Sequence, residues 1–179
     1  MRKNYQSAVV AIPPEEAWDP IQAIRQQHDR QFEHWMPHVN LVYPFLANEE
    51  FAAAVPRMTE AFADIVPVQV TLAELKFFLH PSGRATMWFE PEPVQMFKDL
   101  QASLLELFPT CDDLTKFPGG FEPHLSVGQA DSQESAEDLV LALQEEWKTI
   151  NFQLEAIHVI KREKADPFQI AHAVPLGKT

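Results

Sequence analysis

The sequence predicts an α+β fold built from two related lobes, and three observations support this. Apolar periodicity gives the order strand, helix, strand, helix, hairpin, which is followed by helix, strand, helix, hairpin. A five-residue motif recurs at corresponding places in the two halves. Hydrophobic residues make up 46% of the 179 residues, which is enough for a sizeable core. The near-repeat favours duplication over a doubly wound parallel sheet, and we expect one two-lobed domain spanning residues 1–179.

The first half begins with a predicted buried strand. Ser7–Ile12 is mostly apolar, and the two prolines that follow it cannot continue a hydrogen-bonded ladder. A helix is predicted next, with Asp19 as its N-cap and Pro20 at the first helical position. The face that this helix buries is predicted to carry Ile21, Ile24 and His28.

A second strand, a helix and a hairpin complete the first half. Pro37–Phe45 alternates in the manner of a strand, with His38 and Asn40 on one face. A helix is predicted over residues 48–64, and Pro56 is expected to kink or shorten it. The strands of the hairpin are predicted at Val68–Leu79 and Arg84–Phe89.

The second half repeats this order. Apolar residues at positions 94, 97, 100, 104 and 107 predict an amphipathic helix. Pro123–Val127 is a predicted strand, and another helix is predicted from Ser132 onward. Two closing strands are expected at Phe152–Lys161 and Phe168–Val174.

The charge of the chain narrows the classes of ligand. There are 14 Lys and Arg residues against 26 Asp and Glu residues, which gives a net charge of −12. This balance disfavours a long nucleic-acid partner held by counterion release, whereas one local cationic pocket could still bind a nucleotide-sized ligand. Arg25 and Asp29 have the spacing of an i,i+4 pair, which favours a solvated ion pair over a role in an active site.

The cysteine content and the hydropathy of the chain indicate its cellular compartment. The single cysteine, Cys111, cannot form an internal disulfide or a thiolate metal cluster, and this indicates a reducing compartment. No apolar stretch approaches the roughly 20 residues of a membrane span, and the first residues lack the core of a signal peptide. We therefore expect a soluble cytoplasmic protein, with no membrane partner and as a monomer.

The repeated motif contains the candidate catalytic and phosphate-binding residues. Pro37-His38-Val39-Asn40-Leu41 and Pro123-His124-Leu125-Ser126-Val127 both read Pro, His, aliphatic, hydrogen-bonding residue, aliphatic. A histidine with such a partner two places later is a weak signal alone, and the match at His80 lies in a turn. In a strand, residues i and i+2 point the same way about 6–7 Å apart, so one phosphate can touch both side chains. The matched pair of strands therefore predicts two imidazoles at one site.

Two histidines suit phosphodiester chemistry near neutral pH. One activates the attacking oxygen as a base and the other protonates the leaving oxygen as an acid, while Asn40 and Ser126 stabilise charge on the nonbridging oxygens. Which of His38 and His124 plays which role is open. A zinc site is the competing interpretation, but it needs three or four ligands and no HExxH or cysteine pattern supplies them. Surface or packing roles are predicted for the five other histidines, His28, His34, His80, His158 and His172.

At these residues the chain resembles the two-histidine (2H) phosphoesterase superfamily, which is also called the 2′-5′ RNA ligase-like or cyclic phosphodiesterase family. The similarity extends over Trp35–Phe45, Phe121–Gln129 and the ending from Lys161-Arg162 to Val174–Gly177. The resemblance implies two pseudo-symmetric lobes of antiparallel sheet with helices packed outside and a central groove lined by the motif strands. It also implies metal-independent hydrolysis or ligation at 2′,3′-cyclic or 2′-5′-linked nucleotide ends, without a cofactor.

Residues beyond the motif are candidates for further substrate contacts. Asn40 stands where the family usually has Thr or Ser, and its amide can still donate to a phosphate oxygen. Lys161 or Arg162 could pair with phosphate, or both could be solvated. Packing roles are favoured for the three aromatic residues that could instead stack on a base, Phe45, Trp88 and Phe121.

Three functional hypotheses follow from the sequence. The first is a phosphodiesterase that opens a nucleoside 2′,3′-cyclic phosphate or cleaves a 2′-5′ linkage through His38 and His124. The second is a nucleotide-binding module that has lost turnover, for which Asn40 is the sequence hint. The third is 2′-5′ end-joining of RNA, against which the net charge of −12 argues. The expected partner in each case is a nucleotide or an RNA end.

Overall fold

The structure, a computed structural model, describes residues 2–177 and contains four α-helices and ten strands in that range. The helices are α1 (Trp18–His28), α2 (Phe51–Phe62), α3 (Val94–Leu107) and α4 (Gln133–Glu146). The strands are β1 (Lys3–Asn4), β2 (Ser7–Ala11), β3 (Val39–Val42), β4 (Phe45–Leu46), β5 (Val68–Leu79), β6 (Ala85–Glu92), β7 (Leu125–Ala130), β8 (Ile150–Leu154), β9 (Ala156–Lys161) and β10 (Gln169–Pro175). Short 3-10 helices lie at Glu15–Ala17, Asn48–Glu50 and Asp113–Lys116. Within the described residues, no helix is long and apolar enough to cross a membrane.

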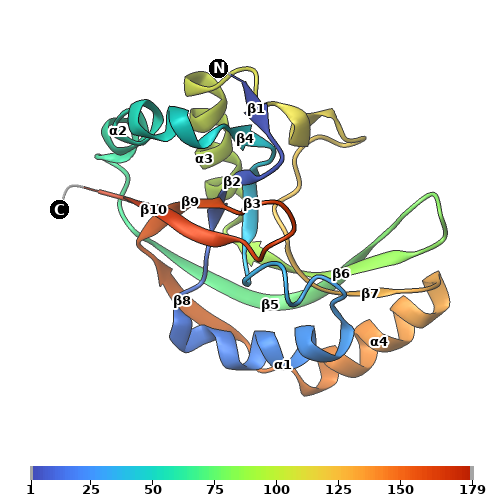
Figure 1. The fold of residues 1–179 in the computed structure, drawn as a ribbon. Helices are drawn as coiled ribbons and strands as arrows, with labels where there is room; N and C mark the ends of the chain where they lie inside the picture. Colours follow the sequence, from blue (N-terminus) through green and yellow to red (C-terminus); the bar gives the residue numbers. More distant parts are fainter. Residues whose placement is uncertain (1, 178–179) are drawn as a thin grey trace.

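Eight of the strands form one curled antiparallel sheet in the order β10-β9-β2-β3-β7-β6-β5-β8. The sheet divides into two sets of four strands between β3 and β7, which are joined through the single pair Val39 and Leu125. In Figure 1, α2 and α3 lie above the strands and α1 and α4 lie below them; α2 contacts β10 and α3 contacts β3, whereas α1 contacts β7 and α4 contacts β5 and β6. The predicted α+β fold with two related lobes is confirmed.

The chain order within the sheet shows how the lobes are linked. Each half runs strand, helix, strand, helix, strand: β2-α1-β3-α2-β5, and then β6-α3-β7-α4 followed by β8 and β9. The last strand of the first half, β5, pairs with β6 of the second lobe, while β9 pairs with β2 of the first lobe. The first lobe therefore contains β9 and β10 from the second half, and the second lobe contains β5 from the first half, which joins the two motif strands in one sheet.

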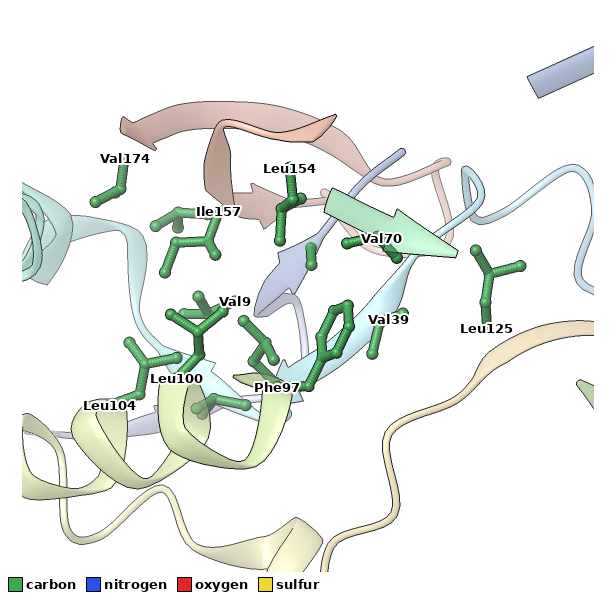
Figure 2. Packing of buried hydrophobic residues seen from close by; sticks show 14 of the residues in the cluster. Val9, Val39, Val70, Phe97, Leu100, Leu104, Leu125, Leu154, Ile157 and Val174 are labelled. Carbon is green, nitrogen blue, oxygen red and sulfur yellow. The ribbon is translucent and has the colours of Figure 1, made fainter. Parts of the chain in front are cut away.

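The main core fills the face of the sheet that the helices cover. Figure 2 shows part of it, where Phe97, Leu100 and Leu104 of α3 point toward side chains of the strands. Val39 and Leu125 belong to this core and are almost completely buried. Because successive residues of a strand point to opposite faces, their motif neighbours must lie on the other face.

A smaller apolar cluster lies on that other face. It is made of Ala8, Val10, Ile12, Ile160 and Phe168, with Trp18, Trp35, Met36 and Tyr43 packed against it. In β2, Ala8 and Val10 belong to this cluster, whereas Val9 and Ala11 belong to the main core. The strict alternation fixes which face of the sheet carries the two histidines.

Two element boundaries near the first motif differ from the prediction. The helix begins at Trp18 after a 3-10 turn, so its N-cap is Ala17 and Asp19 lies inside the first turn. Asp19 remains favourable there, since a carboxylate in the first turn interacts well with the helix dipole. The predicted strand over residues 37–45 is divided into β3 and β4, and the peptide bond between Tyr43 and Pro44 in the gap is cis.

Two later segments also bear on the prediction. The helix α2 continues through Pro56 to Phe62 and is shorter than the predicted helix over residues 48–64. Loss of a hydrogen bond at an interior proline costs about 3 kcal/mol, and this is offset by burial of Phe51, Met58 and Phe62, at roughly 1.5–3 kcal/mol for each large apolar side chain. The predicted strand over residues 152–161 is two strands, because the buried positions shift phase between Leu154 and Ile157. They pair at separate places in the sheet, β8 with β5 and β9 with β2.

Candidate active site

The two motif histidines lie just before neighbouring strands. His38 precedes β3 and His124 precedes β7. Val39 pairs with Leu125, and continuing this antiparallel register by one residue places His38 opposite Ser126 and Asn40 opposite His124. The histidines are then diagonal neighbours on one face, at a Cα separation of about 7–8 Å. The structure thus places the four predicted motif residues on one face of the sheet, two on each of the neighbouring strands.

Both imidazole rings are oriented by a backbone carbonyl. Nδ1 of His38 lies 2.7 Å from the carbonyl oxygen of Met36, and Nδ1 of His124 lies 2.7 Å from that of Glu122. A carbonyl oxygen only accepts, so each Nδ1 carries the proton and donates it. Each neutral ring therefore presents the lone pair of Nε2, which is the form required of a general base.

The two Nε2 atoms have different surroundings. Nδ2 of Asn40 lies 3.1 Å from Nε2 of His38, and because an amide nitrogen only donates, Nε2 accepts this bond. The Oδ1 atom of Asn40 is buried without a partner. Among residues 2–177, no side chain donates to Nε2 of His124. The departure of Asn40 from the family pattern thus has a direct effect on His38.

Aromatic rings hold His38 from one side. The Trp35 ring stacks on the His38 imidazole with a centroid distance of 4.7 Å and on Phe168 at 3.9 Å. The Arg162 guanidinium lies 4.7 Å from the centre of the Phe168 ring. The imidazole of His38 is thus connected through the Trp35 ring to Phe168, which Arg162 contacts in turn.

His124 has a corresponding set of neighbours from the second lobe. The Phe78 ring meets His124 edge-on at 5.1 Å, and Trp88 approaches it at 5.9 Å while stacking on Phe78. Lys76 lies 5.9 Å from the centre of the Trp88 ring and forms a short ion pair with Glu90. In each lobe, a cation therefore contacts an aromatic ring near the histidine: Arg162 contacts Phe168 and Lys76 contacts Trp88. The charge of Lys76 is balanced by Glu90.

The electrostatic environment favours neutral histidines. Burial lowers the pKa of His38 to about 4, with a smaller contribution from the nearby Arg25 cation, and it outweighs the opposite effect of the Met36 hydrogen bond. Burial also lowers the pKa of His124, which the hydrogen bond to Glu122 and the charge of its carboxylate partly oppose. Both rings are thus available as proton acceptors near neutral pH.

The Arg25–Asp29 pair is buried, which corrects the prediction of a solvated ion pair. The side chain of Arg25 is 2% exposed and that of Asp29 is 4% exposed, with 2.8 Å between them. Arg25 also donates to Gln22 Oε1 at 2.9 Å and to the carbonyl of Trp35 at 2.8 Å. Asp29 in turn accepts from Gln129 of β7 at 3.1 Å. The pair is buried because α1 packs closely on β7 at the point where the loop bearing Trp35 folds back.

The other predicted binding residues lie in different environments. Phe45 is fully buried in the main core against Phe51 and Phe108, and Phe121 is half-buried against the same core. Trp88 is almost buried but contacts His124. Strand alternation places Arg162 on the face of the histidines and Lys161 on the opposite face. Of these residues, the structure brings Trp88 and Arg162 to the neighbourhood of the motif.

A cavity of about 670 Å³ lies beside the small apolar cluster. It is lined in part by Ile12 and Trp18, which belong to that cluster. The other side of the cavity is formed by residues of β8, β9 and β10, among them Asn151, Gln153 and His158. None of the residues predicted for the site lines this cavity.

The sequence interpretation missed three residues that hold the histidines. Trp35, Phe78 and Phe168 contact the imidazoles directly or through one ring. Trp35 could have been found from its place three residues before His38, but Phe168 comes from the far end of the chain and has no local signal. Within residues 2–177, no three His, Cys, Asp or Glu side chains are grouped so as to hold a metal ion.

The fold and the paired histidines define the class of the protein as a two-histidine phosphoesterase. The sequence model of the 2′-5′ RNA ligase superfamily matches residues 13–166, and the chain belongs to this superfamily. A search of curated protein sequences found no match.

Solved structures share the fold at low sequence identity. The protein TT0787 of Thermus thermophilus is 13% identical, with a TM-score of 0.66 over 97% of this chain and 99% of that chain. A crystal structure of a phosphoesterase is 14% identical, with a TM-score of 0.65 over 97% and 99% of the two chains. E. coli LigT complexed with 3′-AMP is 12% identical, with a TM-score of 0.63 over 98% and 99%. These similarities establish the fold.

Proposed function

We propose that the protein is a metal-independent phosphodiesterase that hydrolyses 2′,3′-cyclic or 2′-5′-linked nucleotide phosphodiesters. The observation that carries the proposal is the pair of imidazoles on one sheet face, each with Nδ1 donating to a carbonyl so that Nε2 carries the lone pair. A separation of about 7–8 Å between the two Cα atoms lets both rings reach one phosphorus.

The reaction needs one proton acceptor and one proton donor. One histidine removes a proton from water as its oxygen bonds to phosphorus, and the other protonates the ribose oxygen as its bond to phosphorus breaks. The hydroxyl of Ser126 and the amide of Asn40 lie on the same face and can donate to the nonbridging oxygens. Water is consumed and a phosphomonoester forms, while the proton gained by one ring is returned to the other through solvent.

A nucleotide is the substrate that the relatives support. Structures of E. coli LigT have been determined with ATP, 3′-AMP and NADP+. In this chain Arg162 and Trp88 lie near the motif, and they offer a cation for phosphate and an aromatic ring for a base. We therefore place the phosphodiester between His38 and His124.

A nucleotide-binding module without turnover is the second candidate function. The bond from Asn40 to Nε2 of His38 favours it, because this bond occupies the nitrogen that a base must use. On the phosphodiesterase proposal, Asn40 turns from His38 toward a phosphate oxygen when substrate binds. End-joining of RNA is the third candidate, although the net charge of −12 disfavours a long RNA partner.

Hydrolysis by the chelator-treated protein tests the proposal. Purified protein is incubated with EDTA, and then with nucleoside 2′,3′-cyclic phosphates and a 2′-5′-linked dinucleotide. Turnover is expected, and His38→Ala and His124→Ala should each reduce it about 10²–10⁴-fold. His80→Ala is the matched control, since His80 lies at the hairpin tip and bonds Thr86. Tight nucleotide binding without turnover would instead support the binding module.

A further inference from the structure

We propose that the cavity between the 3-10 helix at Glu15–Ala17 and the strands β8, β9 and β10 binds the nucleobase of the substrate, and that it selects bases with an exocyclic amino group over uracil. The inference rests on the proposed function and deepens it, because it names the class of base. Three features carry it: the position of the cavity relative to the motif, a buried imidazole nitrogen in its wall, and the charge of its lining.

The cavity lies on the same face of the sheet as the motif histidines. His158, which lines it, pairs with Val10, and Val10 pairs in turn with Asn40. Ile157 and Val159, the neighbours of His158 in β9, belong to the main core, so the imidazole points to the opposite face, as Asn40 does. Two strand spacings, about 10 Å, separate His158 from Asn40. A nucleoside held by its phosphate at the motif can span this distance.

The near wall of the cavity is adjacent to His38. Ile12 lines the cavity, and continuing the register of β2 and β3 by one residue beyond their last pair places Ile12 opposite His38. Trp18 lines the cavity as well, and its indole N–H donates to the carbonyl of Pro13 at 2.8 Å. This bond fixes the ring in the wall, where it offers an apolar surface to a planar base.

His158 provides a polar atom that a base can satisfy. Its Nδ1 is buried and has no hydrogen-bond partner within residues 2–177. Burial lowers the pKa of the ring, so the imidazole is neutral near neutral pH. Buried polar atoms are normally hydrogen-bonded. The edge of a base carries both donors and acceptors, so it suits either tautomer of the neutral ring.

The charge of the lining excludes phosphate and selects among bases. Three exposed carboxylates, those of Glu15, Glu16 and Glu155, line the cavity, whereas no Lys or Arg stands among the described residues of the lining. Ionised carboxylates only accept hydrogen bonds, and they therefore bind the amino groups of guanine, adenine and cytosine. Uracil has carbonyl oxygens and no amino group, so these carboxylates disfavour it.

The residues on the other side of the motif are compatible with this placement. Arg162, the cation offered to phosphate, does not line the cavity. Trp88 of β6 pairs with Ser126 of β7, so it lies beyond the motif in the direction away from β9. In a linked dinucleotide, one base therefore occupies the cavity and the second nucleoside extends toward Trp88.

Hydrolysis of the four nucleoside 2′,3′-cyclic phosphates tests the base preference. The kcat/KM values for the guanosine, adenosine and cytidine substrates should each exceed that for the uridine substrate by at least about 5-fold. Removing the three carboxylates of the cavity together should abolish this preference, whereas removing three exposed carboxylates of α4 should preserve it at the same net charge. The two triple variants are Glu15→Gln, Glu16→Gln, Glu155→Gln and Glu134→Gln, Glu145→Gln, Glu146→Gln. Equal kcat/KM on the four substrates, or equal effects of the two triple variants, would overturn the proposal.

The variant His158→Leu tests the wall of the cavity. It removes the imidazole and keeps most of its volume, so it should raise KM for guanosine 2′,3′-cyclic phosphate about 2–10-fold without changing kcat. Hydrolysis of glycerol 1,2-cyclic phosphate, which has no base, should be unchanged. His172→Leu is the matched control, because His172 is exposed on β10 and contacts Phe51. Equal losses on both substrates would show that His158 acts only on the fold, and this would contradict the proposal.

A binding measurement separates this inference from the proposed function. Calorimetry with guanosine 3′-monophosphate and uridine 3′-monophosphate requires no turnover. We expect tighter binding of the guanosine ligand and, in ¹⁵N-histidine-labelled protein, a shift of the His158 resonances when it binds. This preference without any turnover would reject the phosphodiesterase and retain the base site. Turnover with equal binding of the two ligands and unshifted His158 resonances would reject the base site and retain the phosphodiesterase.

Discussion

Replacing Arg25 by methionine tests whether a buried ion pair organises the first motif. The change keeps most of the side-chain volume and removes the guanidinium, which is 2% exposed. Its hydrogen bonds to Asp29, Gln22 and the Trp35 carbonyl are all lost. The Asp29 carboxylate is left buried with only its bonds to Gln129 and the Gln31 amide.

The expected cost follows from this uncompensated charge. Removing one partner of a buried ion pair costs about 3–5 kcal/mol, and the two remaining bonds to Asp29 place the expected value near the lower limit. For a chain of this length, 1 kcal/mol shifts the melting temperature by about 2–4 °C. We therefore expect a decrease of at least about 6 °C, measured by thermal and urea unfolding at neutral pH.

A surface ion pair supplies the control for this prediction. Arg30 and Asp131 are 2.6 Å apart but are 50% and 79% exposed, so Arg30→Met should cost less than about 1 kcal/mol. Equal effects of Arg25→Met and Arg30→Met would refute the reasoning. A double variant in which Asp29→Leu accompanies Arg25→Met should recover part of the loss, because no unpaired charge remains.

Further predictions concern pH, packing and salt. Because burial lowers the pKa of His38 to about 4 and also lowers that of His124, the pH profile of kcat/KM should have its optimum on the acid side of neutrality; a plateau extending above pH 8 would contradict it. Gly128→Ala should destabilise the fold by about 1–3 kcal/mol in urea unfolding, because the new methyl would lie 2.6 Å from Cβ of His28 and 2.9 Å from Cε of Met87; unchanged stability would show that α1 shifts freely. Binding of 2′-5′-linked oligonucleotides should depend on salt with a slope of about 1 or less whatever their length, whereas a slope that grows with length would indicate a long RNA surface.

Periodic elements were predictable because their local pattern and their burial agree. The apolar spacing of α3 matches the residues that it buries, Phe97, Leu100 and Leu104. The hairpin of β5 and β6 and the helix predicted from Ser132, which the structure shows to cap α4, also follow from local chemistry. The division of residues 150–161 into β8 and β9 was less apparent, because a one-residue phase shift is easily read as one long strand.

The features of the site that could not be predicted from the sequence depend on tertiary contacts. An arginine four residues before an aspartate looks the same on a surface as in a core, so burial of Arg25 depends on the packing of α1 against β7. The i,i+2 spacing predicted that His38 and Asn40 share a face, but the amide bond to Nε2 is a matter of side-chain geometry. Phe168 reaches the Trp35 ring only because the chain returns along β9 and β10.

The most direct test of the central claim is hydrolysis of a nucleoside 2′,3′-cyclic phosphate by the EDTA-treated protein, in parallel with His38→Ala and His124→Ala. Formation of the phosphomonoester should be observed with the unaltered chain and should fall by about 10²–10⁴-fold in each variant. Full activity in either alanine variant, or loss of activity on chelation that a divalent cation restores, would contradict two-histidine, metal-independent catalysis.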